Sequence, residues 1–450
     1  MEKIVYIVHC VDTEGPLYES LEATFERIFD AYGIRIDPSE ENLKKLQAKK
    51  IDLSGKEEAI ANMVSPNLQK YNNTWEKIDK ILDEITSNDF RKNFLDSYDN
   101  GWIYNWFCID HVGYTGENPR RRDLGFHKIF DHYSNYMKSK DITTDMIQWH
   151  FHPLSIKKDA HRSGTTYVSS SIIFEILSHK IIDKKWFPAA FRPGFHTERP
   201  DSNWFLEQWI PFDYANQAVK GIPTDQPDLS NGRFGDWRRS PKEWKVYHPD
   251  HDNYQKEGNC RRWIARCLNM EARLRQITID DVRDGFKRAE SGKPTLISFT
   301  NHDFRDMKSD IIKIRNMIKK VCKEFSEVKF RYSNAIDAMR GIIDKNDLSN
   351  PDFVVNLEKA AKSTLISIKA NNDIFGPQPF FAIKTKANEY IWQNLDFQRK
   401  NQWSYTFDRE TIEIDDVDTI GIAANTSSGV TEIIVINPEE EKIKKKILNN

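Results

Sequence analysis

The sequence predicts an α/β domain followed by a smaller all-β domain, and two observations carry this prediction. Across residues 1–346, short apolar runs alternate with segments whose apolar residues recur every three or four positions, as in a parallel sheet or a (β/α) barrel. Across residues 347–450, short segments alternate or run apolar between turn residues, which is typical of an antiparallel, sandwich-like domain.

The composition of the 450 residues supports packed cores and excludes several classes of protein. Hydrophobic residues make up 39% and aromatic residues 12%, which is unlike a disordered chain. The formal net charge is -2, so no basic excess predicts binding to nucleic acid or to an anionic membrane. Apolar runs stay below the roughly 18 residues of a membrane helix, and the five cysteines form no CxxC pair. We therefore expect a cytoplasmic protein with reduced thiols and no membrane span.

The elements of the first domain are expected in this order. A buried strand runs from Ile4 to Val11, directly before Asp12. A charged segment with spaced Leu, Ile and Met residues, at about 37–100, predicts a helical insertion that covers one side of the domain or contacts a partner. Residues 307–325 show the clearest amphipathic helix. The other strand candidates lie at 102–109, 149–153, 190–194, 210–213 and 296–303.

In the second domain, strands are expected at 364–368, 380–383, 411–414, 420–423 and 432–436. The aromatic residues Trp392, Trp403, Tyr405 and Phe407 favour core packing over contacts with glycans. The charged tail at 439–446 predicts a solvated chain end. We expect this domain to have an accessory role in substrate binding or oligomerisation.

Residues that are capable of chemistry follow the expected strands of the first domain. The carboxyl ends of the strands of a barrel open at one mouth, so these residues are expected to converge. Asp12 and Glu14 follow the first strand, where one carboxylate could bind a metal ion while the other accepts a proton from water. The alternative is a helix cap with a solvent-facing Glu14.

His150 and His152 lie two residues apart at the end of another expected strand. Side chains at positions i and i+2 of a strand project to the same face, so both imidazoles could bind one metal ion. A pair of histidines in the core or on the surface is the alternative.

Two further motifs carry candidate catalytic side chains. His302 ends a late strand and precedes Asp303, which could fix its tautomer or raise its pKa, so His302 is a candidate general acid. Arg192, followed by Pro193 and Gly194, could place a guanidinium beside a catalytic carboxylate or a substrate. A helix cap by Asp303 and a surface turn at Arg192 are the alternatives.

A polar stretch of the first domain carries Trp237, Trp244 and Tyr247. Aromatic rings in such a stretch can stack on sugars, although core packing is the commoner fate of these residues. Together with His111, which follows the strand candidate at 102–109, they are the candidate substrate-binding residues.

The order of these motifs resembles that of the polysaccharide deacetylase superfamily (NodB homology, carbohydrate esterase family 4). Over about residues 1–345 the chain presents Asp-x-Glu, then His-x-His-Pro, then Arg-Pro-Gly and finally His-Asp. The resemblance implies a deformed (β/α) barrel in which Asp12 is the base and His302 the acid. It implies that Glu14, His150 and His152 are the metal ligands. Arg192 would then orient Asp12 or the substrate.

The resemblance also implies a function. It predicts a metal-dependent hydrolase that removes an N-acyl group, typically N-acetyl, from an amino sugar in polysaccharide or surface-glycan metabolism. The expected cofactor is a divalent ion, Zn²⁺. The expected partner is a carbohydrate substrate, as an amino sugar, a glycan or a sugar-nucleotide, with no nucleic acid, and a homo-oligomer is left open.

The chain departs from the family's pattern at two motifs. Asp12 and Glu14 replace a pair of adjacent aspartates, which leaves open which carboxylate is the main ligand. The family's histidines lie four residues apart rather than two, so His111 or His161 could replace one of the two as a ligand. Two other functions stay open: a catalytically silent carbohydrate-binding or assembly module, and a metal-free, allantoinase-like amide hydrolase.

Overall fold

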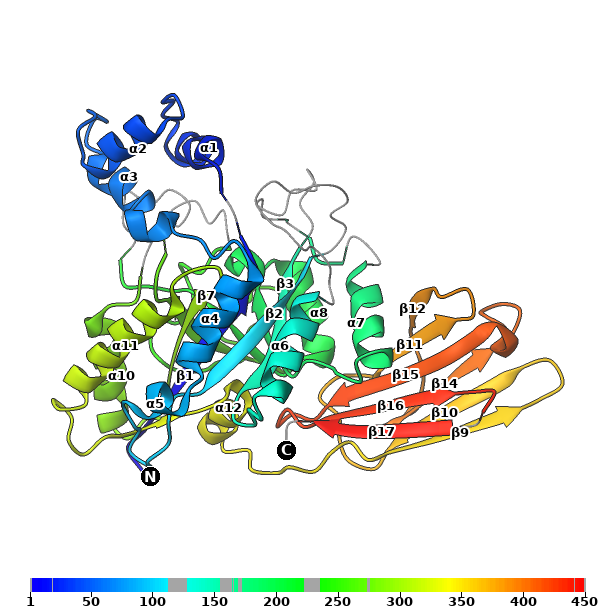
Figure 1. Cartoon of the computed structure of the whole chain (residues 1–450). Helices are drawn as coiled ribbons and strands as arrows, with labels where there is room; N and C mark the ends of the chain where they lie inside the picture. Colours follow the sequence, from blue (N-terminus) through cyan, green and yellow to red (C-terminus); the bar gives the residue numbers. More distant parts are fainter. Residues whose placement is uncertain are drawn as a thin grey trace.

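The structure of the chain is a computed structural model. It describes residues 2–17, 19–111, 128–153, 164, 166–168, 172–221, 235–272, 276–440 and 442–448. A parallel barrel, a helical insertion and two antiparallel sheets make up these parts of the chain, and the sheets lie beside the barrel (Figure 1).

Within the described residues, the first domain is built on eight parallel strands in the order β2-β3-β4-β5-β6-β7-β1-β8. β1 also pairs with β2, so the seven strands β1 to β7 close into a barrel. The bounds are β1 Ile4–Thr13, β2 Tyr104–His111, β3 Met146–His152, β4 Ala190–Pro193, β5 Phe212–Asn216, β6 Trp263–Asn269, β7 Thr295–His302 and β8 Lys329–Tyr332.

β1 closes the barrel because its two halves pair with different neighbours. Ile4–Ile7 pairs with β8, His9–Thr13 pairs with β2, and β7 runs along both halves. The ring is therefore completed at the carboxyl end of β1, where Asp12 lies. This architecture confirms the predicted α/β barrel, and its closure is irregular.

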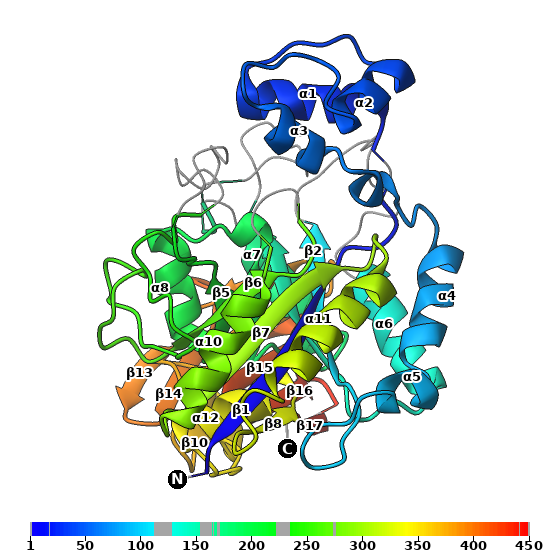
Figure 2. The ribbon, with the colours of Figure 1, turned by 90° about the vertical axis from the view of Figure 1, so that its left-hand side faces the viewer.

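Helices pack around the outside of the barrel (Figures 1 and 2). They include α6 Lys128–Ser139, α7 Ile172–Ile182, α8 Pro200–Trp209, α10 Ile279–Glu290, α11 Met307–Val321 and α12 Ala335–Ile343. In α11, Ile311, Ile314 and Ile318 are fully buried, which confirms the amphipathic helix expected in this region. Among the described residues, no helix combines the length and the apolar character that crossing a membrane requires.

The helical insertion joins β1 to β2 and has two parts. Its helices are α1 Leu21–Tyr32, α2 Glu40–Gln47, α3 Glu57–Met63, α4 Trp75–Ile85 and α5 Asn88–Lys92. The first three share a small core of their own, which includes Phe25, Leu46 and Ile60. They lie above the carboxyl end of β1, whereas α4 and α5 lie along the side of the barrel (Figure 2). The helices begin at Leu21, earlier than the predicted start near residue 37.

The C-terminal domain contains two antiparallel sheets, ordered β13-β14-β10-β9 and β12-β11-β15-β16-β17. Their bounds are β9 Phe353–Lys359, β10 Thr364–Ala370, β11 Phe380–Thr385, β12 Tyr390–Gln393, β13 Asp396–Arg399, β14 Gln402–Phe407, β15 Val417–Asn425, β16 Thr431–Asn437 and β17 Lys442–Leu448. This confirms the predicted β domain. The segment at 411–414 was expected to be a strand, but Ile414 begins a short 3-10 helix.

The central strands β11, β15 and β16 of the larger sheet are buried on both faces. One face packs on the smaller sheet through residues such as Phe381 and Ile422. The other face packs on α7 and α8 of the barrel domain through Phe380 and Ala423. Trp403, Tyr405 and Phe407 lie in the core between the sheets, and Trp392 stacks on Phe174 of α7. The tail is largely exposed, as expected, yet it forms the edge strand β17.

Candidate functional site

The carboxyl ends of β1, β3, β4 and β7 bring six polar side chains together at the mouth of the barrel. The strands are parallel, so the last inward-facing residue of each strand reaches the same opening. We call this group the mouth cluster; it consists of Asp12, Glu14, His150, His152, Arg192 and His302.

Glu14, His150 and His152 form a compact triangle of ligand atoms. The two Nε2 atoms of the histidines lie 3.1 Å apart, and Glu14 Oε1 lies 3.6 Å from His150 Nε2 and 3.5 Å from His152 Nε2. Ligand atoms that each lie about 2.0–2.1 Å from a tetrahedral ion are separated from one another by about 3.3 Å. The observed triangle therefore has the size that a single small cation requires.

The orientation of His150 also suits a metal ligand. Its Nδ1 lies 3.0 Å from the carbonyl oxygen of Arg192, so Nδ1–H donates this hydrogen bond and the lone pair of Nε2 faces Glu14 and His152. Burial lowers the pKa of His150 to about 3, which keeps the imidazole neutral, as metal binding requires. One carboxylate and two imidazoles are a donor set typical of zinc sites that keep a position open for water or substrate.

Gly194 makes room for the second histidine. A Cβ atom at this position would lie 2.0 Å from Cδ2 of His152, so any other residue would push the imidazole aside. The Arg-Pro-Gly motif therefore provides the space that the ring of His152 occupies. It lets His152 pack against the end of β4.

Asp12 and Arg192 form a buried ion pair beside the triangle. Arg192 donates from Nε to Asp12 Oδ1 at 2.6 Å and from Nη2 to Oδ2 at 3.0 Å, and Thr300 donates to Oδ2 at 3.2 Å. Burial alone would raise the pKa of Asp12, but the charge and hydrogen bonds of Arg192 hold it well below its usual range. Both Asp12 oxygens are thus engaged by Arg192, which favours Glu14 as the carboxylate ligand.

His302 lies at the accessible edge of the mouth cluster. Its Nε2 atom is 3.9 Å from both Asp12 Oδ2 and Glu14 Oε1. A quarter of its side chain is exposed, whereas the side chains of Asp12 and Glu14 are almost fully buried. His302 can therefore meet a molecule that enters the mouth and contacts the buried carboxylates.

Asp303 has a different role from the predicted one. Its two oxygens accept hydrogen bonds from the backbone amides of Glu14 and Gly15, at 2.8 and 2.9 Å, and from the hydroxyl of Tyr133 at 2.9 Å. These contacts hold the loop that carries Glu14. Asp303 is therefore a positioning residue, and the expectation that it tunes His302 is corrected.

The structure also corrects the predicted sugar-stacking residues. Trp244 lies in the hydrophobic core and donates to the carbonyl oxygen of Asp281. Trp237 and Tyr247 are buried in a smaller apolar cluster. Burial of these rings outweighs the polar character of the flanking sequence, so none of the three presents a free face to a ligand. His111 ends β2, but its side chain, like all of His161, lies outside the described residues.

Two polar residues at the mouth were missed by sequence reasoning. Asn269 ends β6, and His196 follows the Arg-Pro-Gly motif. The position of His196, four residues after Arg192, was the available signal.

A scan of protein-family models found no match to the chain, and searches of curated proteins and of solved structures found none either.

Proposed function

We propose that this protein is a metal-dependent hydrolase that removes an N-acyl group, typically N-acetyl, from an amino sugar of a glycan or sugar-nucleotide. The observation that carries the proposal is the Glu14–His150–His152 triangle beside the ionised Asp12–Arg192 pair. The motif order, which resembles that of the polysaccharide deacetylases, and the α/β barrel support this reaction class. The choice of an amino sugar depends on the resemblance.

Glu14, His150 and His152 would hold a divalent ion, and their chemistry favours Zn²⁺. Such an ion supplies Lewis acidity, which makes a water molecule a better nucleophile and polarises an amide carbonyl. The carbonyl of Arg192 fixes the ring of His150, and Asp303 fixes the loop that carries Glu14. The ligands are therefore oriented before any ion arrives.

Asp12 acts as the base that accepts a proton from water. Arg192 keeps this carboxylate ionised and fixes the direction of both of its oxygens. His302, whose Nε2 lies 3.9 Å from Asp12 Oδ2, passes the proton that Asp12 takes from water to the departing amine.

Metal analysis and a substrate panel test this proposal. We expect about one equivalent of zinc in protein that is purified without chelator. We also expect release of acetate from N-acetylglucosamine oligosaccharides or from UDP-N-acetylglucosamine. Allantoin serves as the ureide comparison. Absence of bound metal together with tight binding of oligosaccharide would instead favour the silent carbohydrate-binding module.

A further inference from the structure

The turn that follows Arg192 is strained at two consecutive residues. Phe195 has φ +53° and His196 has φ +54°, which is the left-handed region that residues with a Cβ atom disfavour. Histidine adopts this region more often than most residues do, but for the bulky Phe195 beside it the conformation is an outlier. Such strain persists only where the surrounding structure enforces it, and it concentrates at functional sites.

Contacts of its backbone enforce the conformation of His196. Its carbonyl oxygen accepts a hydrogen bond from Trp237 Nε1 at 2.8 Å. The backbone of Gly235 approaches so closely that a Cβ there would lie 1.9 Å from the same oxygen. Thr197 donates to the carbonyl oxygen of Gly194 at 3.0 Å and closes the turn. The burial of Trp237 thus holds the histidine in place.

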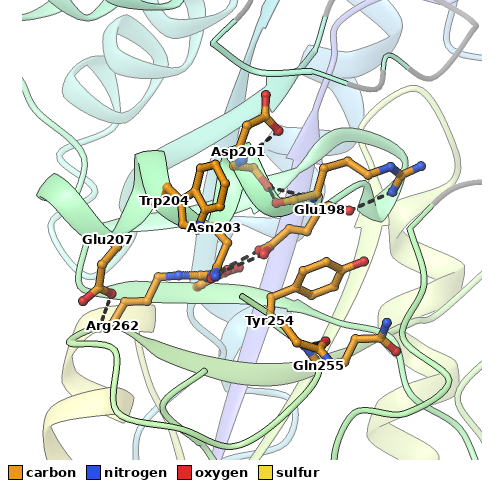
Figure 3. Close-up of polar contacts among 12 residues, drawn as sticks. Glu198, Asp201, Asn203, Trp204, Glu207, Tyr254, Gln255 and Arg262 are labelled. Carbon is orange, nitrogen blue, oxygen red and sulfur yellow. Dashed lines mark hydrogen bonds and ion pairs between the residues drawn. The ribbon is translucent and has the colours of Figure 1, made fainter. Parts of the chain in front are cut away.

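Buried ion pairs also hold the turn in place at its upstream and downstream ends in the sequence. Upstream, Arg192 pairs with Asp12. Downstream, Glu198 pairs with Arg262 at 3.0 Å. Figure 3 shows Arg262 reaching toward Glu198 and Asn203. We call Glu198, Asn203, Asp213 and Arg262 the anchor cluster.

Every side chain of the anchor cluster is almost completely buried. Breaking such a pair leaves an uncompensated buried charge, so the segment cannot relax by releasing Glu198. The two ion pairs therefore preserve the strained turn between them.

The imidazole of His196 lies at the mouth of the barrel. The side chain of Asn269, at the end of β6, is within hydrogen-bonding reach of the ring, and Arg192, Asp12 and His150 are near enough for their charges to act on it. Its Nδ1 atom is buried, and within the described parts of the chain it has no hydrogen-bond partner. His196 is not a member of the metal-ligand triangle. The described residues therefore leave the hydrogen-bonding capacity of this ring nitrogen unused.

We propose that His196 is a substrate-binding residue whose imidazole hydrogen-bonds a hydroxyl group next to the acylated amine of the sugar. The inference rests on the proposed function and names the group of the substrate that the site recognises, which is this hydroxyl. A hydroxyl can both donate and accept, so it pairs with a neutral imidazole. A phosphate or carboxylate would need a cation, and the nearby guanidinium of Arg192 is committed to Asp12.

The test compares two amides that differ in their hydroxyl groups. The first is an N-acetylglucosamine oligosaccharide, and the second is N-cyclohexylacetamide, which has no hydroxyl. His196→Ala is expected to lower kcat/KM for the oligosaccharide by about 10- to 100-fold, mainly through KM, and to leave the cyclohexyl amide unaffected. Zinc content should not change. His251→Ala, at an exposed histidine, is the matched control.

A second variant separates a binding role from a structural one. His196→Gly removes the ring and relieves the left-handed strain, so it should raise Tm while it lowers kcat/KM for the oligosaccharide. A lower Tm, a loss of zinc, or equal losses for both amides would overturn the inference. If the wild-type protein hydrolyses neither amide, the proposed function itself fails and the inference fails with it.

Discussion

The mouth cluster and the anchor cluster are both buried and charged, yet they are satisfied in different ways. In the anchor cluster, Arg262 bonds directly to Glu198, Asp213 and Asn203. Burial, followed by the charge of Glu198, raises the pKa of Asp213 well above its usual range, so a proton compensates the second carboxyl group. The charge of Arg262 is therefore paired directly with carboxyl groups inside this cluster.

In the mouth cluster, Arg192 compensates Asp12, and imidazoles lie beside Glu14 among the described residues. Glu14 Oε1 lies 3.5–3.9 Å from the Nε2 atoms of His150, His152 and His302. These separations exceed the hydrogen-bond range and suit atoms that share an ion. Spacing, more than burial or charge, therefore separates a binding site from a structural ion network.

The largest expected effect comes from removing a ligand of the mouth cluster. His150→Ala should abolish metal binding and lower turnover by roughly three orders of magnitude or more. Metal analysis of the purified variant and acetate release measure the two effects. His251→Ala, which changes an exposed histidine, should retain both properties. A His150→Ala protein that keeps its metal and its activity would remove the assignment of the site.

Breaking the anchor cluster should instead destabilise the fold. Arg262→Leu leaves Glu198 buried without its guanidinium, so the free energy of unfolding should fall by about 3–5 kcal/mol. Urea denaturation measures this change. The adjacent Arg261 is more than half exposed, and Arg261→Leu should change stability little. Equal stabilities of the two variants would show that the anchor cluster does not clamp the chain.

Asp310 is a buried carboxyl group outside both clusters, and within the described residues no guanidinium pairs with it. Asp310 accepts a hydrogen bond from Asn301, and burial raises its pKa to about 7. The folded protein therefore holds this proton more tightly than the unfolded chain, and stability should fall as the pH rises from about 4 through 7. Between pH 5 and pH 8, the free energy of unfolding of the wild type should fall by about 2–3 kcal/mol through this group. Asp310→Asn should not show this loss.

Urea denaturation at pH 5 and pH 8 checks the prediction for Asp310. Asp284→Asn on α10, at a partly exposed carboxylate, is the control and should leave the pH dependence unchanged. An identical pH dependence in Asp310→Asn and wild type would contradict the raised pKa of Asp310.

The smallest expected effect concerns the loop that carries Glu14. Asp303→Asn retains one carbonyl oxygen and cannot accept from both backbone amides as the carboxylate does, so metal affinity should fall about 10- to 100-fold. Competition with a zinc chelator measures this change. Tyr133→Phe removes only the hydroxyl contact to Asp303 and should weaken metal binding less. Unchanged affinity in Asp303→Asn would make the loop independent of this contact.

The fold class could be predicted because periodicity is a local property of the chain. The amphipathic pattern of α11 and the short runs of the C-terminal strands are visible in the sequence. The edge strand β17 was missed because its lysines are typical of a solvated tail, and pairing with β16 decides its conformation. The start of α1 was missed because its apolar face packs only within the small core of α1 to α3.

At the candidate site, sequence reasoning identified side chains by their chemistry and by their place after strands. Whether an aromatic residue is buried or presented to a ligand depends on contacts that are remote in sequence. Trp237, for example, donates a hydrogen bond to the backbone carbonyl of His196 instead of stacking on a sugar. The role of Asp303 likewise depends on Glu14 and Gly15, nearly 300 residues earlier in the chain.

The sequence by itself determined which side chains are chemically capable and that they follow buried strands, because residue type and strand periodicity are local properties of the chain. Only the tertiary structure decided which carboxylate meets the histidines and which meets an arginine. The closure of β1 onto both β2 and β7 sets those distances, and a difference of less than 1 Å separates a hydrogen bond from a space for an ion.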